Sequence, residues 1–137
     1  MESILKIFLL LSLVMLTVTI QAAELNKEER AKRKIVSRMY QVSERVLARC
    51  PKKDKNDFEE SLMKFKKTYP EFISLVENSV YRKYAIDTYS DDAKKRKAKT
   101  AEDLSRECLY IKSLLDDMLT TEHGKKSVES MVEILKK

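Results

Sequence analysis

The sequence predicts an all-α protein: a compact bundle of four to five helices, tied by one disulfide and preceded by a signal peptide. Its 137 residues include one Gly and two Pro, whereas sheets joined by tight turns need such residues for their special backbone angles. Charged residues make up 36% of the chain, and Lys, Glu and Leu are abundant, which favours helices. Apolar residues recur at steps of three and four along several segments, as expected for helices that bury one face.

Residues 1–22 are typical of a secretory signal peptide. An apolar, uncharged stretch follows Lys6 at residues 7–20, and the small side chains of Ala22 and Ala23 suit the narrow subsite of signal peptidase. We expect cleavage after Ala22 or Ala23, and hence a protein that is secreted or periplasmic. An uncleaved membrane anchor is the alternative, but fourteen apolar residues are short for the roughly 20 that span a bilayer.

The mature chain, residues 23–137, is expected to fold as a single helical domain. Asn26 can cap its first helix, with Glu29 three residues later as the partner in a capping box. Pro51 ends this helix, because the residue before a proline is pushed out of the α region. A second, shorter helix covers about residues 54–67.

The remaining helices follow from proline, threonine and glycine signals. Pro70 opens a third helix that extends to about residue 89, and Thr100 caps a fourth. Gly124, the only glycine of the chain, is suited to a left-handed cap that ends the fourth helix, and His123 beside it is interpreted as a helix-end side chain that complements the dipole. A short amphipathic segment completes the domain. The residues expected to face the core are Ala31, Ile35, Met39, Val42, Val46, Cys50, Phe58, Leu62, Phe65, Phe72, Ile73, Val76, Val80, Tyr84, Leu104, Cys108, Ile111, Leu115, Met118, Val128, Met131, Val132 and Leu135.

The two cysteines, Cys50 and Cys108, are predicted to form a disulfide. Both lie on apolar stripes of their helices, so they can approach each other when those helices pack. An oxidising compartment favours the bond in a small exported domain. Closing a loop of nearly sixty residues contributes roughly 4 kcal/mol on the chain-entropy model. Two buried free thiols, or pairing with another chain, are the alternatives.

No motif for a cofactor or a metal is present, and none is expected to bind. One glycine excludes a phosphate-cradling loop, and one histidine with two bridged cysteines cannot supply a zinc site. Neighbouring carboxylates such as Asp116 and Asp117 point about 100° apart on a helix, so they cannot clasp one substrate together. An enzyme would therefore need a carboxylate pair that only the fold assembles, and this is the least favoured interpretation.

The charge of the chain suggests an acidic partner. The net charge is +6, which favours an acidic protein, a polyanion or an anionic membrane surface, whereas no nucleic acid is expected for an exported protein of this moderate charge. A short basic run is the candidate polyanion contact, and a solvated linker is its alternative interpretation. The run consists of Lys94, Lys95, Arg96, Lys97 and Lys99.

These observations together predict a non-enzymatic exported protein that uses a basic surface to bind an acidic partner. The alternative is a carrier that holds a small apolar ligand among the aromatic side chains of its helical core. Core packing explains the same aromatic stripes more simply.

Overall fold

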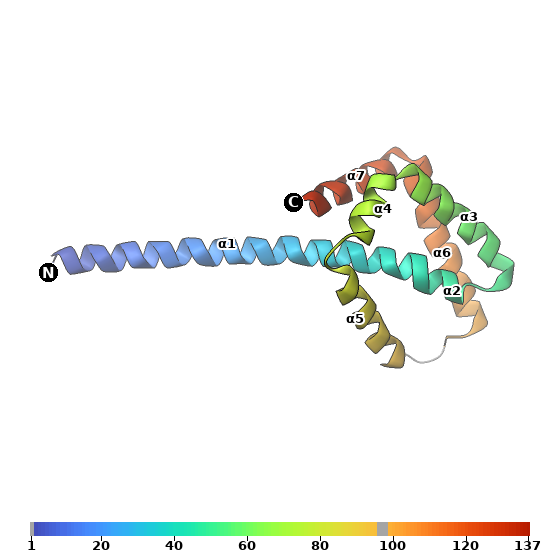
Figure 1. The fold of residues 1–137 in the computed structure, drawn as a ribbon, viewed down its shortest axis with the longest axis horizontal. Helices are drawn as coiled ribbons and strands as arrows, with labels where there is room; N and C mark the ends of the chain where they lie inside the picture. The colour runs from blue at the N-terminus through green and yellow to red at the C-terminus, as the bar shows by residue number, and fades with distance from the viewer. Residues whose placement is uncertain (1, 96–98) are drawn as a thin grey trace. The chain divides into compact units, whose positions relative to one another are not determined.

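The structure, a computed structural model, describes the backbone of residues 2–95 and 99–137, and it is helical with no strand over these ranges (Figure 1). Side chains are described for residues 4–7, 9, 26–88 and 99–137. The helices are α1 (Glu2–Tyr40), the π-helical turn η1 (Gln41–Val46), α2 (Leu47–Arg49), α3 (Lys52–Thr68), α4 (Pro70–Glu77), α5 (Arg82–Lys95), α6 (Ala101–Thr120) and α7 (Glu122–Lys136).

The all-α prediction is confirmed, but the predicted count of four to five helices is wrong. Seven α-helices occur in the described ranges. The difference has two causes: the π-helical turn separates α2 from the end of the first predicted helix, and a break at residues 78–81 divides the third predicted helix into α4 and α5.

The chain divides into two compact units, Met1–Ala31 and Lys32–Lys137. The first is a stretch of α1 in which the described apolar side chains Ile4, Leu5 and Ile7 are exposed. Among the helices whose side chains are described, none has the length and apolarity needed to cross a membrane. The second unit contains the buried core.

The predicted start of the first helix at Asn26 is wrong, because α1 continues through this residue. A capping side chain is useful only where the first backbone N–H groups of a helix lack carbonyl partners. Here the preceding residues are themselves helical, and they supply those carbonyls. The predicted end before Pro51 is confirmed, since Cys50 has left the helical region with a ψ of 128°.

The π-helical turn lies in the middle of the first helix, between buried residues on either side of it. One extra residue in a helix rotates the following side chains by about 100°. Before the turn, Val36 and Met39 lie beside Val76 of α4, whereas Val46 at the end of the turn and Cys50 after it are also buried. The turn therefore lets one continuous segment pack against different neighbours along its length.

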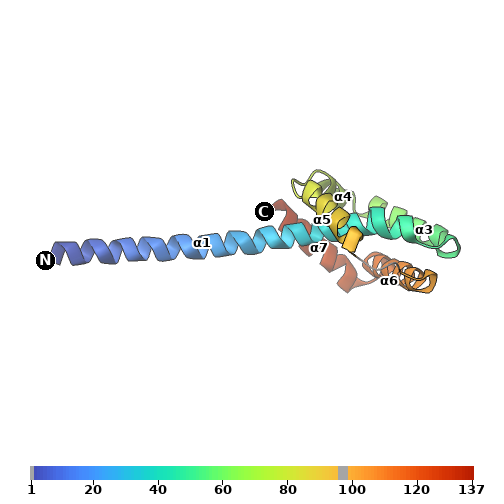
Figure 2. The same cartoon turned by 90° about the horizontal axis from the view of Figure 1, so that it is seen from below.

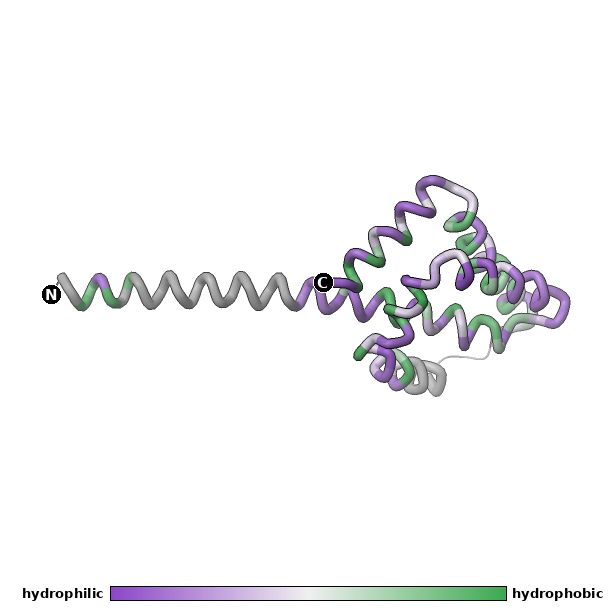
Figure 3. The backbone as a smooth tube through the Cα atoms, turned by 45° about the horizontal axis from the view of Figure 1, so that its top comes forward, coloured by the Kyte–Doolittle hydropathy of each residue, from purple (hydrophilic) through white to green (hydrophobic). Residues whose placement is uncertain are grey.

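The helices α3 and α6 run side by side in both views of the fold (Figures 1 and 2). In α3 the predicted core residues Phe58, Leu62 and Phe65 are buried, and the Phe65 ring meets Phe72 of α4 edge-on with 5.9 Å between centroids. Hydrophobic and hydrophilic stretches alternate along these helices, as amphipathic packing requires (Figure 3). The buried apolar residues are Val36, Met39, Val46, Cys50, Phe58, Leu62, Phe65, Phe72, Val76, Ala85, Cys108, Leu115 and Val128.

The prediction that Val80 and Tyr84 face the core is wrong. Val80 is 84% exposed and Tyr84 is 47% exposed, whereas Ala85 is fully buried. The helix ends at Glu77 because short polar side chains follow it: the Asn78 amide bonds to the Ser74 hydroxyl, and the Ser79 hydroxyl accepts the Tyr81 backbone N–H. Such local bonds compete with helix continuation, so the chain resumes in a new register.

At the start of α6 the predicted cap is confirmed, since the Thr100 hydroxyl accepts the backbone N–H of Asp103 at 3.1 Å. The predicted end of this helix at His123 and Gly124 is wrong. The helix stops at Thr120, and Thr121 caps α7 by accepting the Gly124 N–H at 2.9 Å. His123 is therefore an exposed residue in the first turn of α7, not a side chain at the C-terminal end of a helix.

Gly124 serves a close approach between α6 and α7 and has no positive φ. A Cβ atom on this residue would lie 2.3 Å from the Asp117 carbonyl oxygen and 2.6 Å from the Met118 Cα. These are backbone atoms that cannot move aside independently. The only glycine of the chain is thus required by helix packing and does not end a helix.

We predict that Gly124→Ala destabilises the fold by about 1–3 kcal/mol or more, because the added methyl group meets the α6 backbone. At an ordinary helical position the same change stabilises by about 1 kcal/mol, so the sign of the effect is diagnostic. Chemical denaturation measures it. Ser130→Ala, on the exposed side of α7, is the matched control and should shift stability by a few tenths of a kcal/mol at most. A more stable Gly124→Ala variant would contradict this packing role.

Candidate functional site

The predicted basic run is only partly placed by the structure. Lys94 and Lys95 end the backbone of α5 with side chains outside the described ones, and Arg96 and Lys97 lie outside the described residues. Lys99 is exposed, and its ammonium group lies 2.6 Å from a carboxylate oxygen of Glu107. The one described charge of this run is therefore balanced within the protein, and the polyanion contact stays a prediction.

A denser concentration of positive charge lies elsewhere, in residues 32–53. This segment contains eight basic residues and one acidic residue, Glu44, for a net charge of +7. The whole chain has a net charge of +6, so everything outside the segment sums to −1. The basic residues are Lys32, Arg33, Lys34, Arg38, Arg45, Arg49, Lys52 and Lys53, and we call this segment the cationic helix.

Helix amphipathicity places many of these charges at the surface. Val36, Met39, Val46 and Cys50 bury the apolar side of the segment, so its polar side faces solvent. Four of the cations are exposed (Lys34, Arg38, Lys52 and Lys53), and the other four are half-buried (Lys32, Arg33, Arg45 and Arg49).

Most of these cations have no acidic partner among the residues whose side chains the structure describes. The ion pairs and side-chain hydrogen bonds between described residues use none of Lys32, Lys34, Arg38, Arg45, Arg49, Lys52 or Lys53. Some cations on α3, α6 and α7 are paired, namely Lys64 with Glu60, Arg106 with Glu102, and Lys136 with Glu71. The cationic helix is thus a surface whose charge is available to an external anion.

Arg33 is the exception, because it contributes to packing. Its guanidinium lies 4.8 Å from the ring centroid of Tyr84 and 5.5 Å from that of Tyr81. A cation over an aromatic face contributes about 0.5–1 kcal/mol at a partly exposed site. This contact attaches α5 to the first helix, and it explains how α5 packs although Tyr84 is half exposed.

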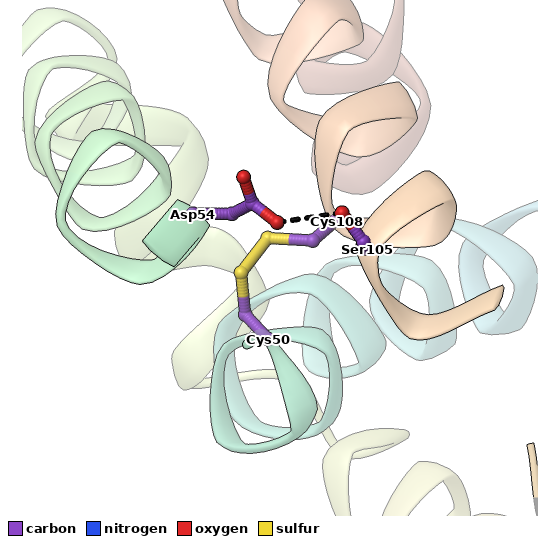
Figure 4. Close-up of a disulfide and its surroundings, with 4 residues drawn as sticks. All are labelled: Cys50, Asp54, Ser105 and Cys108. Atoms are coloured by element: carbon purple, nitrogen blue, oxygen red, sulfur yellow. Dashed lines mark hydrogen bonds between the residues drawn. A yellow bond between two sulfur atoms is a disulfide. The ribbon is translucent and has the colours of Figure 1, made fainter. Parts of the chain in front are cut away.

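The C-terminal end of the cationic helix is anchored by the disulfide between Cys50 and Cys108 (Figure 4). Their Cα atoms are 5.5 Å apart, so the predicted bond is confirmed. Beside it the Ser105 hydroxyl donates to the Asp54 carboxylate at 2.7 Å, which links α6 to the first turn of α3 (Figure 4). The cross-link and this hydrogen bond hold Arg49, Lys52 and Lys53 on a fixed backbone.

The neighbouring carboxylates Asp116 and Asp117 do not form an acid/base pair. Asp116 accepts a hydrogen bond from Ser61 of α3 at 2.7 Å and one from Lys112 at 2.6 Å, whereas Asp117 is exposed. Burial tends to raise the pKa of Asp116, but the bonds from Lys112 and Ser61 and the nearby Lys charges together lower it below the ordinary value. Asp116 is therefore a charged clamp between α3 and α6. No metal-holding group of three His, Cys, Asp or Glu side chains occurs in the described part of the chain.

A small surface hollow of about 40 Å³ lies beside the first helix. Val36, Met39 and Val76 form part of its lining, and it is open to solvent. Charged side chains also line it, namely Glu44, Lys66, Glu77 and Arg82. A charged, open hollow differs from the enclosed apolar cavity that a carrier of a small apolar ligand would need.

A run of consecutive basic residues does not mark the cationic helix in the sequence, because its cations are spread at helical spacing. A running charge count over about twenty residues, compared with the apolar stripe of the same helix, finds them from the sequence alone.

Comparisons of this chain with protein-family models, with curated proteins and with solved structures each found no match.

The clamp at Asp116 predicts how stability responds to acid. A carboxyl group whose folded pKa is lowered contributes stability above its unfolded pKa, near 3.8, and loses it as the pH falls through the folded value. We expect Asp116→Asn to unfold at lower temperature than the unaltered protein at neutral pH, with the gap closing below a pH of about 4. Asp117→Asn removes the same charge from the exposed neighbour, and it should leave the melting temperature nearly unchanged. An equal loss in both variants would contradict the clamp.

Proposed function

We propose that this protein is an exported, non-enzymatic interaction protein whose cationic helix binds an acidic partner. The observation that supports this most strongly is the set of seven cations in residues 32–53, all except Arg33, that have no acidic partner among the described side chains. The rest of the chain is nearly neutral in sum. Net charge by itself favours acidic partners only diffusely, whereas a localised excess defines a surface.

Such a concentration of like charge is unfavourable for the isolated protein. Lys34 and Arg38 are four residues apart on one helix, and so are Arg45 and Arg49. Like charges at this spacing destabilise a helix by about 0.2–0.5 kcal/mol for each pair. An acidic partner removes this repulsion and adds attraction, so the arrangement favours the bound state.

Two features support export. Residues 1–22 have the charge and hydropathy of a signal peptide, with Ala22 and Ala23 as the cleavage region. The buried disulfide is typical of proteins from oxidising compartments such as the periplasm or the extracellular space. Both features fit a mature domain that meets its partner outside the cytoplasm.

Export predicts a defined mature N-terminus. Protein isolated from its natural source should begin at Ala23 or Glu24, as measured by intact mass and N-terminal sequencing. The residues removed carry one positive and one negative side chain, so the mature protein keeps the full positive excess. Recovery of a chain that still includes residues 1–22 would contradict cleavage and favour the membrane anchor.

The binding role predicts salt-sensitive association that depends on the cationic helix. We expect the protein with an intact disulfide to bind at least one of polyglutamate, heparin and vesicles containing phosphatidylglycerol at low ionic strength, and to be released at high ionic strength. The double change Lys34→Gln and Arg38→Gln should weaken that binding about tenfold or more, at roughly 1 kcal/mol for each charge.

The matched control is the double change Lys125→Gln and Lys126→Gln, which removes the same charge from exposed positions of α7. It should weaken binding by less than about twofold, because these residues lie outside the cationic helix. Isothermal titration calorimetry measures both variants. Equal losses of affinity in the two double variants would mean that only net charge determines binding. An absence of binding to every probe would contradict the proposed function.

A further inference from the structure

We infer that the acidic partner of the cationic helix is a linear sulfated polysaccharide. This inference rests on the proposed function and adds the chemistry of the partner. Three properties of residues 32–53 support it: the linear arrangement of the charges, the share of arginine among them, and the kinds of side chain that this surface lacks.

The charges follow a helix axis and do not converge on one point. From Lys34 to Arg49 the helix rises about 22 Å, and Lys52 and Lys53 follow after the break at Cys50 and Pro51, in the first turn of α3. Within this run, Lys34 and Arg38, like Arg45 and Arg49, are separated by a rise of about 6 Å. A small anion can meet only one or two of these side chains, whereas a linear polymer with repeated anionic groups can meet several of them in succession.

Arginine contributes three of the four cations between residues 34 and 49, namely Arg38, Arg45 and Arg49. A guanidinium presents parallel N–H groups that pair with two oxygens of one oxyanion, whereas an ammonium acts as a point charge. Sulfate groups offer three terminal oxygens for such pairing. The arginines therefore favour a partner with oxyanion groups over one with diffuse negative charge.

The same segment exposes no large apolar side chain. The exposed large apolar residues of the described part of the chain lie before residue 10 or after residue 62, and none lies in residues 32–53. A helix that inserts at a membrane surface needs apolar or aromatic side chains on its free face, and here the apolar face is already buried in the core. Protein interfaces commonly combine arginine with buried aromatic anchors, and this surface offers arginine without such anchors.

A sulfated polysaccharide needs no such anchors. Its surface consists mostly of sulfates, carboxylates and hydroxyls, which pair with Lys and Arg and with neutral polar groups such as the half-buried Gln41 side chain. Binding of single-stranded nucleic acid would require exposed aromatic rings for base stacking, and the surface lacks these as well. The expected export of the protein also favours a polymer found outside the cytoplasm.

The test compares heparin with polymers that share either its negative charge or its sugar backbone. Binding to heparin is measured by isothermal titration calorimetry beside fully desulfated heparin, polyglutamate, duplex DNA and phosphatidylglycerol vesicles. We expect heparin to bind at least about tenfold more tightly than each of the other four, because only heparin presents a linear array of sulfates.

Two variants test the residues. Replacing Arg38, Arg45 and Arg49 together by Lys keeps the charge, and it should weaken heparin binding several-fold while leaving polyglutamate binding less affected. Lys34→Gln with Arg38→Gln should lose about tenfold or more of the heparin affinity, and Lys125→Gln with Lys126→Gln less than about twofold. Unchanged melting temperatures and an intact disulfide confirm that each variant is folded.

The possible negative results separate failure of the polysaccharide inference from failure of the proposed function. If polyglutamate, duplex DNA or vesicles bind as tightly as heparin through the cationic helix, the sulfated polysaccharide is overturned and the proposed function stands. If desulfated heparin binds as well as heparin, sulfate is not recognised and the inference is again overturned. If no probe binds in a way that depends on Lys34 and Arg38, both proposals fail.

Discussion

The burial of one side of residues 32–50 is the constraint on which the rest of the structure depends. The buried residues of this segment must leave water together, and this fixes the rotation of the segment about its axis. They are Val36 and Met39 before the π-helical turn, Val46 at its end and Cys50 after it. Because the apolar side is held inward, the polar side and its cations are held outward. One hydrophobic constraint thus positions both the core and the charged surface, and a change that unpacked the core would also disperse the charges.

The disulfide completes this arrangement at the end where the segment turns into α3. A cross-link over 58 residues stabilises the fold by about 4 kcal/mol on the chain-entropy model, chiefly by restricting the unfolded chain. It also joins the cationic helix to α6, whose Ser105 bonds to Asp54 and whose Asp116 holds Ser61. These links run between helices far apart in sequence, so the surface charges lie on a braced scaffold. Because the backbone that carries the cations is already ordered, binding costs side-chain entropy and little backbone entropy.

The sequence was sufficient for features that depend on local periodicity and insufficient for those that depend on packing between helices. The helical class, the core faces of Phe58, Leu62 and Phe65, and the pairing of Cys50 with Cys108 all follow from regular apolar spacing and are confirmed. The break after Glu77 was missed because the apolar spacing continues across it, while short polar side chains end the helix locally. The role of Gly124 was misjudged because its reason is the α6 backbone 2.3 Å from its missing Cβ, which no local pattern reveals. The cationic helix could have been found from sequence, since its charge excess is a matter of counting. Only the structure shows that its cations other than Arg33 have no acidic partner among the described side chains.

The central claim is that residues 32–53 form the binding surface of this protein. Backbone amide signals followed by nuclear magnetic resonance during a heparin titration test it residue by residue. We expect the largest changes in amide chemical shift at the start of α3 and at four residues before it, and small changes in α7. The four residues are Lys34, Arg38, Arg45 and Arg49. Shifts concentrated on α7, on residues 94–99 or evenly over all basic positions would contradict it.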